Sequence, residues 1–151
     1  MTSRIDAPQP QPQEKITIPN AELRGGWLNL HAARFREIQL AGTEVEVRGH
    51  CQSACTAVMV YIFWSKLCFA ENSSLQFHAG RNLPPDWKAG DQWAHSPLSY
   101  EGPKWLSDHY PSAIRNWIDA RGGYTKLPTD TSYWILPASE LWAMGYRKCL
   151  D

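Results

Sequence analysis

The pattern of apolar and polar positions predicts helices and strands in alternation. Helical spacing of apolar side chains predicts an amphipathic helix over residues 27–40. Alternation in TEVEVR, residues 43–48, predicts a strand, and the run KITIP at 15–19 predicts another. Two more short strands are predicted at 67–70 and 75–78. Because strands and helices alternate, we expect an α/β fold with a mostly parallel sheet and flanking helices.

A run of small residues at 49–56 leads into the most apolar segment, Ala57 to Trp64. This pattern predicts a tight turn followed by a helix that is buried on every side. Residues 79–103 are rich in Gly and Pro and predict a long loop that carries Trp87 and Trp93. Long ordered loops are often functional.

The last third of the chain predicts further helices around one extended segment. Residues 104–121 are predicted to be helical with an interruption at Pro111, because proline cannot continue a helix from within. Residues 129–135 are predicted to be extended, and 137–144 to form a short helix that ends before a glycine.

Length and composition indicate one ordinary domain preceded by an arm. The chain has 151 residues, of which 43% are hydrophobic and 20% charged, so it can bury a core. Residues 1–14 are rich in Pro and Gln and predict a flexible arm, with a single domain over 15–151. The formal net charge is zero, so nothing points to nucleic acid as a partner. No apolar run is long enough to span a membrane, and no signal peptide is visible.

The cysteines permit disulfides without demanding them. Cys51 and Cys55 are four residues apart, a spacing that a bridge could accommodate, and such a bridge would clamp the turn between them. A disulfide there would imply an oxidising compartment. Together with Cys68 and His78, these cysteines follow no familiar zinc spacing, so we predict no metal site. The fourth cysteine is Cys149.

Ser53 lies where a predicted strand turns into the predicted buried helix. At that position a serine is either a helix cap or a nucleophile whose oxyanion is stabilised by the N–H groups of the helix start. A serine hydroxyl is a weak nucleophile and needs a base within hydrogen-bond reach. His78 is the candidate base, because imidazole titrates near neutral pH.

The motif Gly49-His-Cys-Gln-Ser-Ala-Cys, followed by Phe77-His-Ala-Gly, resembles the Clp protease proteolytic-subunit family. It is most similar to stand-alone bacterial Clp-like proteins with a C-x-S-A-C-T motif. The resemblance implies a fold of the Clp-protease and crotonase type, with Ser53 as the nucleophile and His78 as the base. It covers about residues 15–147.

The resemblance also implies an oxyanion hole and a third catalytic residue. The double glycine Gly25-Gly26 matches the family's oxyanion loop, so the N–H groups of Gly26 and Ala54 are the expected donors, and Gly25 is expected to bind substrate. Asp130 is the candidate acid that orients His78, although Tyr133 stands in the column of the family's aspartate.

The segment before the double glycine is shorter than in the family. About two strands of the usual fold are therefore expected to be missing on the N-terminal side. The family usually self-associates, and relatives with this motif are often exported, so the resemblance implies a homo-oligomer in the periplasm or outside the cell.

Two functional hypotheses follow. The first is a serine hydrolase, most simply a peptidase acting on peptide or protein substrates without a cofactor, with Trp87 and Trp93 lining the substrate cleft. The second is a non-catalytic binding or assembly protein on the same scaffold, because a fold does not guarantee an activity. The two differ in whether Ser53 and His78 meet, with an acid behind the histidine.

Overall fold

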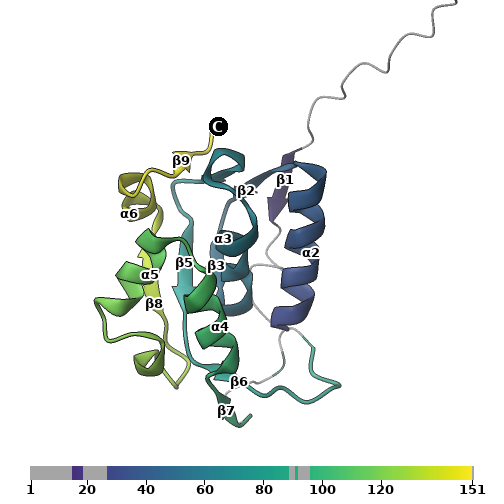
Figure 1. Ribbon diagram of the computed structural model, residues 1–151, viewed down its shortest axis with the longest axis vertical. Helices are drawn as coiled ribbons and strands as arrows, with labels where there is room; N and C mark the ends of the chain where they lie inside the picture. Colours follow the sequence, from purple (N-terminus) through teal and green to yellow (C-terminus); the bar gives the residue numbers. More distant parts are fainter. Residues whose placement is uncertain (1–14, 19–26, 89–90, 92–95, 151) are drawn as a thin grey trace, which may run out of the picture.

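The computed structural model describes residues 15–18, 27–88, 91 and 96–150. The predicted arm, residues 1–14, lies outside the described residues, as do the double glycine and Trp93. Figure 1 shows strands at the centre of the described part and helices around them.

Four parallel strands form the larger sheet, in the order β1-β2-β4-β9. The predicted strands at 15–19, 43–48 and 67–70 are confirmed as its first three members. The alternation in β2 places Val45 and Val47 in the core, with at most 1% of either side chain exposed. The strands are β1 (Lys15–Ile18), β2 (Glu44–Val47), β4 (Leu67–Phe69) and β9 (Arg147–Lys148).

A second sheet carries the candidate site, in the order β3-β5-β8. Its strands are β3 (His50–Gln52), β5 (Ser74–Phe77) and β8 (Trp134–Pro137). β3 and β5 are parallel, whereas β5 and β8 are antiparallel. The expectation of an α/β fold with a parallel sheet and flanking helices is therefore confirmed, with an antiparallel strand at one edge.

The predicted helix over 27–40 is α2 (Leu28–Ala41), which ends where Gly42 adopts a left-handed φ of 68°. It packs its buried Phe35 and Ile38 toward the core, against the segment that begins at Ser53. A single residue, Thr43, connects Gly42 to β2. Figure 1 shows α2 along one side of the molecule, next to β1.

The predicted buried helix over 57–64 is wrong in its second half. The segment begins as the 3₁₀ turn η1 (Ser53–Ala57) and continues as α3 (Val58–Tyr61). At Ile62 the backbone is no longer helical but extended. Phe63 and Trp64 are 68% and 63% exposed. Apolar residues without periodicity cannot tell a helix from the loop that follows it, so the pattern alone placed the end too late.

Of the remaining helices, α5 and α6 lie on the side of the molecule away from α2, and α4 lies in the middle of the view (Figure 1). Pro111 separates α4 from α5, as predicted. The long loop after His78 contains a short antiparallel hairpin, in which β6 and β7 have two residues each. The sequence pattern did not predict these strands. None of the described helices is long and apolar enough to cross a membrane. The elements are η2 (Trp64–Lys66), β6 (Gly80–Arg81), β7 (Leu98–Ser99), α4 (Glu101–His109), α5 (Ser112–Asp119), η3 (Tyr124–Lys126) and α6 (Ala138–Ala143).

Candidate active site

Ser53 has an unusual backbone. Its φ is +53°, the only positive φ of a residue other than glycine in the part of the chain that is described. For an L-amino acid the left-handed conformation costs about 1–2 kcal/mol, because Cβ approaches the following carbonyl oxygen. Strained backbone of this kind clusters at functional sites, and the surrounding structure must hold it in place. The positive φ therefore marks Ser53 as a candidate functional residue.

The register of β3 and β5 explains why Ser53 and His78 come together. The two strands are parallel, and Gln52 is the partner of Gln76. Gln52 Nε2 also donates a hydrogen bond to Gln76 Oε1, at 3.0 Å. Ser53 follows the first strand by one residue and His78 follows the second by one residue. Both thus lie at the carboxyl ends of neighbouring parallel strands, where α/β proteins place their ligand sites.

His78 is held in one tautomer by the backbone. Its Nδ1 lies 2.6 Å from the carbonyl oxygen of Ala79. Because a carbonyl only accepts hydrogen bonds, Nδ1 carries the proton, and in the neutral ring Nε2 is the unprotonated nitrogen. Ala79 is fixed in turn, since its N–H donates to the Pro128 carbonyl at 2.8 Å. The backbone thus orients the imidazole, a task that a carboxylate performs in a Ser-His-Asp triad.

The environment of His78 favours the neutral ring. Burial lowers the pKa of His78 to about 4, helped by the positive charge of Arg81, and the hydrogen bond to Ala79 offsets this only in part. At neutral pH the imidazole is therefore uncharged and able to accept a proton, although it is a weaker base than an exposed histidine.

Tyr133, rather than Asp130, packs against His78. The two rings meet edge to face with centroids 4.8 Å apart. Asp130 is exposed, and its Oδ1 accepts hydrogen bonds from the backbone N–H of Ser132, at 2.8 Å, and from the hydroxyl of Ser132, at 2.5 Å. These bonds hold the pKa of the Asp130 carboxyl below its ordinary value. The described contacts of Asp130 include no hydrogen bond to His78.

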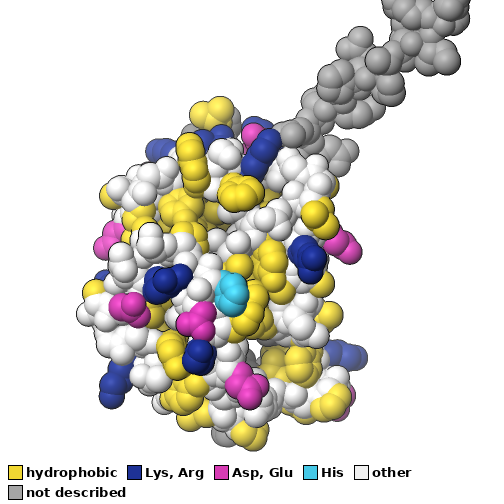
Figure 2. Space-filling model, in the orientation of Figure 1, with side chains coloured by type: hydrophobic (Ala, Val, Ile, Leu, Met, Phe, Trp, Pro, Cys, Tyr) yellow, Lys and Arg dark blue, Asp and Glu magenta, His cyan; other side chains and the backbone are white. Residues whose placement is uncertain are grey.

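Ser53 and His78 line one cavity of about 330 Å³. Ala54 and Trp87, two of the other predicted site residues, line it as well. Figure 2 shows a recess on this face, in the region where α2 and α4 approach each other in Figure 1. No hydrogen bond joins the Ser53 hydroxyl to His78 in the described part of the chain. Catalytic hydrogen bonds are often long without substrate, so proximity within one cavity is the relevant observation.

The cavity is largely apolar in its depth. Buried side chains from β5, α4, α5 and the segment before β8 form its inner wall, namely Phe77, Leu106, Tyr110, Ile118 and Leu127. Gly80 lies at the wall where the hairpin meets α4. A Cβ there would lie 2.5 Å from the Ser99 carbonyl oxygen and 2.9 Å from Pro103 Cδ, so only glycine allows this close approach. A cavity of this size and lining suits an apolar group of a ligand.

Three of the predicted site residues lie outside the described residues, namely Gly25, Gly26 and Trp93. Trp27, the first described residue after the double glycine, lines the cavity. The start of α2 therefore borders the site. The oxyanion role of Gly26 stays a prediction.

Sequence reasoning missed Thr56 and Tyr110. Thr56 is 1% exposed, and its Oγ1 donates to the Ser53 carbonyl oxygen at 2.6 Å. Tyr110 comes from the junction of α4 and α5, and its hydroxyl lies 2.6 Å from Thr56 Oγ1. Thr56 was visible as a polar residue at the start of an apolar run, but nothing in the linear pattern links it to a tyrosine 54 positions later.

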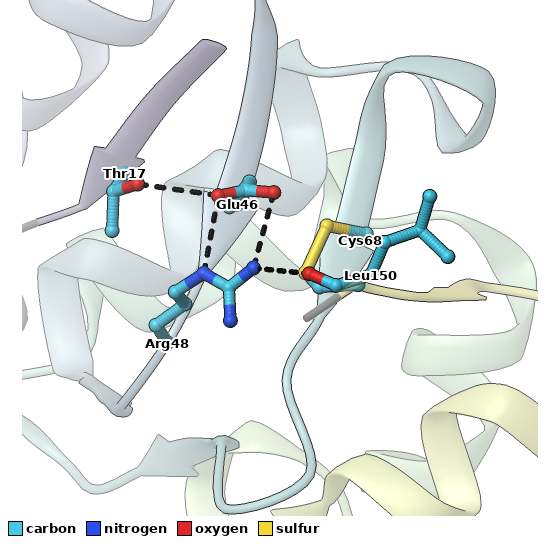
Figure 3. Close-up of polar contacts among 6 residues, drawn as sticks. Thr17, Glu46, Arg48, Cys68 and Leu150 are labelled. Carbon is cyan, nitrogen blue, oxygen red and sulfur yellow. Dashed lines mark hydrogen bonds and ion pairs between the residues drawn. A yellow bond between two sulfur atoms is a disulfide. The ribbon is translucent and has the colours of Figure 1, made fainter.

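All four cysteines are paired. Cys51 and Cys55 form one disulfide, across the turn that holds Ser53, and Cys68 and Cys149 form the other. Glu46 lies near the second pair, but its carboxylate accepts hydrogen bonds from Arg48 (Figure 3). Sulfurs joined in a disulfide are not thiolate ligands, so the cysteines here act as cross-links.

No family model matches the chain, and no curated protein or solved structure matches it either. The likeness to the Clp proteolytic subunits therefore rests on the motifs in the sequence.

Proposed function

We propose that the protein is a serine hydrolase with a fold of the Clp-protease and crotonase type, acting on peptides. The observation that carries the proposal is the pairing of Ser53, in a left-handed backbone, with His78 on the wall of the same cavity. Acyl transfer needs a serine nucleophile with a base near it, and the role is supported by a serine at a strand end that lines the same cavity as a neutral imidazole.

In the proposed reaction, Ser53 Oγ attacks the scissile carbonyl carbon while His78 Nε2 takes the hydroxyl proton. The resulting oxyanion is bound by the N–H groups of Ala54 and Gly26, as the resemblance implies. His78 then gives the proton to the leaving amine as the C–N bond breaks. Water repeats the sequence on the acyl-enzyme, and the acid is released. The Ala79 carbonyl keeps Nε2 directed at the reacting atoms throughout, because it holds the Nδ1 proton.

A peptide substrate fits the walls of the cavity. The apolar inner surface accepts a side chain, while Trp27 and Trp87 at the cavity wall offer flat surfaces for the rest of the ligand. The two disulfides support the expectation of an exported protein, since structural disulfides form in oxidising compartments.

One observation favours the alternative, a non-catalytic binding or assembly protein. The Nδ1 hydrogen bond of His78 goes to the backbone carbonyl of Ala79, whereas the predicted acid, Asp130, binds Ser132. The strongly exposed Phe63 and Trp64 also suit an interface, including one between copies of the chain. We favour the hydrolase because a binding protein has no need of a strained serine beside a histidine.

Labelling with a fluorophosphonate probe tests the proposal. We expect the wild-type chain to be labelled, and Ser53→Ala and His78→Ala to be labelled at least about a hundredfold more slowly. Matched controls are Ser65→Ala, an exposed serine, and His109→Ala, an exposed histidine whose Nδ1 also bonds a backbone carbonyl, that of Trp105 at 2.7 Å. Both controls should label at the wild-type rate. A folded wild-type chain without labelling would overturn the hydrolase and leave the binding protein.

The pH profile tests the role of His78 separately. Protonated imidazole cannot accept a proton, so labelling should be slow in acid and rise as His78 loses its proton. Because burial lowers the pKa of His78 to about 4, the rise should be centred near pH 4, with a plateau through neutral pH. The chain's circular dichroism at each pH checks that it stays folded. A rise of the same shape in His78→Ala would show that another group is the base.

A further inference from the structure

A chain of two hydrogen bonds runs from Tyr110 to the backbone of Ser53. Thr56 Oγ1 lies 2.6 Å from the Ser53 carbonyl oxygen and 2.6 Å from the Tyr110 hydroxyl oxygen. A carbonyl oxygen only accepts, so the single proton of the Thr56 hydroxyl is donated to Ser53. Thr56 must therefore accept from Tyr110. The chain has one direction, from the Tyr110 O–H to the Thr56 O–H to the Ser53 C=O.

Both hydroxyls are buried, so water does not compete for them. Thr56 is 1% exposed and Tyr110 is 3% exposed. Burial also raises the pKa of Tyr110 above its ordinary value, which keeps the phenol protonated and able to donate. A buried hydrogen bond between fixed partners is stronger than one in water and defines a single geometry.

Tyr110 is itself held rigidly from outside the turn. It lies between α4 and α5, where the Arg115 guanidinium donates to the Ser107 and Tyr110 carbonyl oxygens at 2.9 and 3.1 Å. Its ring meets Phe77, the residue before His78, edge to face at 5.9 Å. Tyr110 thus contacts both arms of the candidate site, the Ser53 turn through its hydroxyl and the His78 strand through its ring.

We propose that Tyr110 and Thr56 are positioning residues that hold Ser53 in its left-handed conformation. The inference rests on the proposed function of Ser53 as the nucleophile. The left-handed φ of a serine is unfavourable alone, so other groups must retain it. The hydrogen bond to the Ser53 carbonyl fixes the peptide plane directly after the strained φ. When this bond is lost, the hydroxyl of Ser53 should leave its position in the cavity that Ser53 and His78 line.

The variants remove one hydroxyl at a time and preserve shape. Tyr110→Phe keeps the ring against Phe77, and Thr56→Val keeps the volume of threonine. We expect each to slow fluorophosphonate labelling about tenfold or more, because small displacements of reacting groups have effects of this order. Thr56→Ser keeps the donor and should label like the wild-type chain. The double variant should be no slower than Thr56→Val alone, since both changes break one chain.

A matched control separates positioning from general loss of stability. Tyr146→Phe removes the hydroxyl of a half-buried tyrosine that packs edge to face on Phe69, away from the cavity. It should label at the wild-type rate. Rates are compared under conditions in which circular dichroism shows every variant to be fully folded. Wild-type rates for Tyr110→Phe and Thr56→Val in labelled, folded protein would overturn the proposal.

A readout independent of activity keeps the two proposals distinguishable. The ¹³Cα and ¹³Cβ chemical shifts of Ser53 report its backbone conformation whether or not the serine reacts. We expect them to change in Tyr110→Phe and Thr56→Val but not in Thr56→Ser or Tyr146→Phe. If the wild-type chain is not labelled, the hydrolase fails and these shifts still decide the positioning role. Unchanged shifts in both hydroxyl deletions would overturn that role alone.

Discussion

The two disulfides of this protein lie in regions that differ in the length of chain that each disulfide closes. The first, the Ser53 turn, is the segment from Cys51 to Cys55, whose cysteines are four positions apart. The second, the Cys68–Cys149 clasp, joins residues 81 positions apart and ties the end of β9 to β4. Both cysteines of the turn are 0% exposed, and those of the clasp are 6% and 5% exposed.

The clasp is surrounded by groups that also tie distant segments together. Arg48 donates to the Leu150 carbonyl oxygen at 2.7 Å and binds the Glu46 carboxylate, which accepts a further hydrogen bond from Thr17 (Figure 3). Cys149 N–H donates to the Phe69 carbonyl oxygen at 3.1 Å. No described residue here is strained. The clasp therefore ties distant segments of the fold together, away from the cavity that Ser53 lines.

The disulfide of the Ser53 turn, in contrast, stabilises a local backbone conformation. Its disulfide brackets the single strained residue of the described chain, and the Thr56 hydroxyl bonds the carbonyl of that residue. A cross-link over so few residues removes little entropy from the unfolded chain. The comparison teaches that two disulfides in one domain can serve different purposes, and that the length of the closed loop together with the local backbone shows which.

The largest expected effect on stability comes from opening the clasp. Cys68→Ala with Cys149→Ala should lower the free energy of unfolding by about 4–5 kcal/mol, because a closed loop of this length removes much entropy from the unfolded state. Urea denaturation measures the change. The fluorophosphonate labelling rate of the protein that remains folded should equal the wild-type rate. A loss of labelling in folded protein would break the comparison.

Removing the disulfide of the Ser53 turn should affect stability less, and the labelling rate more, than removing the disulfide of the clasp. Cys51→Ala with Cys55→Ala should lower the free energy of unfolding by only about 2 kcal/mol, the loop-entropy value for so short a span. Labelling should nevertheless slow about tenfold or more, because Ser53 is then free to leave the left-handed region. The same denaturation and labelling measurements serve as readout. Wild-type labelling would show that the hydrogen bond from Thr56 holds the turn without the disulfide.

The smallest effect is expected at the ion pair beside the clasp. Arg48→Gln should lower the free energy of unfolding by less than about 1 kcal/mol, because a solvated pair contributes little. Arg48 holds the pKa of the Glu46 carboxyl below its ordinary value of 4.5, so this stabilisation is present above that pH and is lost as the pH falls below it. Denaturation should thus show a larger deficit at pH 7 than at pH 3, where the hydrogen bond from Arg48 to the Leu150 carbonyl oxygen still contributes. An equal deficit at both would assign it to that hydrogen bond or to packing.

Local patterns were sufficient for three strands of the larger sheet and for the first long helix. β1, β2 and α2 follow from alternation or from helical spacing, because each buries one face against the core, whereas β4 is an apolar run with all three residues buried. The same reasoning extended the helix after Ser53 into Phe63 and Trp64, since an uninterrupted apolar run has no period that marks its end. It also could not foresee that β8 pairs antiparallel with β5, because pairing direction depends on the route of the chain.

The site divides in the same way. Ser53 and His78 were singled out by the small-residue motif around Ser53, the later Phe-His pair and the family resemblance that these carry. The parallel strands β3 and β5 end one residue before Ser53 and His78, respectively. Asp130 was chosen for its charge, but its carboxylate binds Ser132 nearby, and a backbone carbonyl orients His78 instead. Backbone groups carry no residue-specific signal, so a sequence pattern cannot reveal them as partners.

The sequence by itself determined the α/β class and three of the four strands of the larger sheet, because these follow from periodicity along the chain. Its motifs, through the family resemblance, named Ser53 and His78 as the residues on which the proposed chemistry depends. Only the tertiary structure decided the left-handed backbone of Ser53, the pairing of the cysteines, the ring of Tyr133 on His78 and the hydrogen bonds from Tyr110. Each of these joins groups whose distance is set by how the elements pack, and packing depends on all the side chains at once.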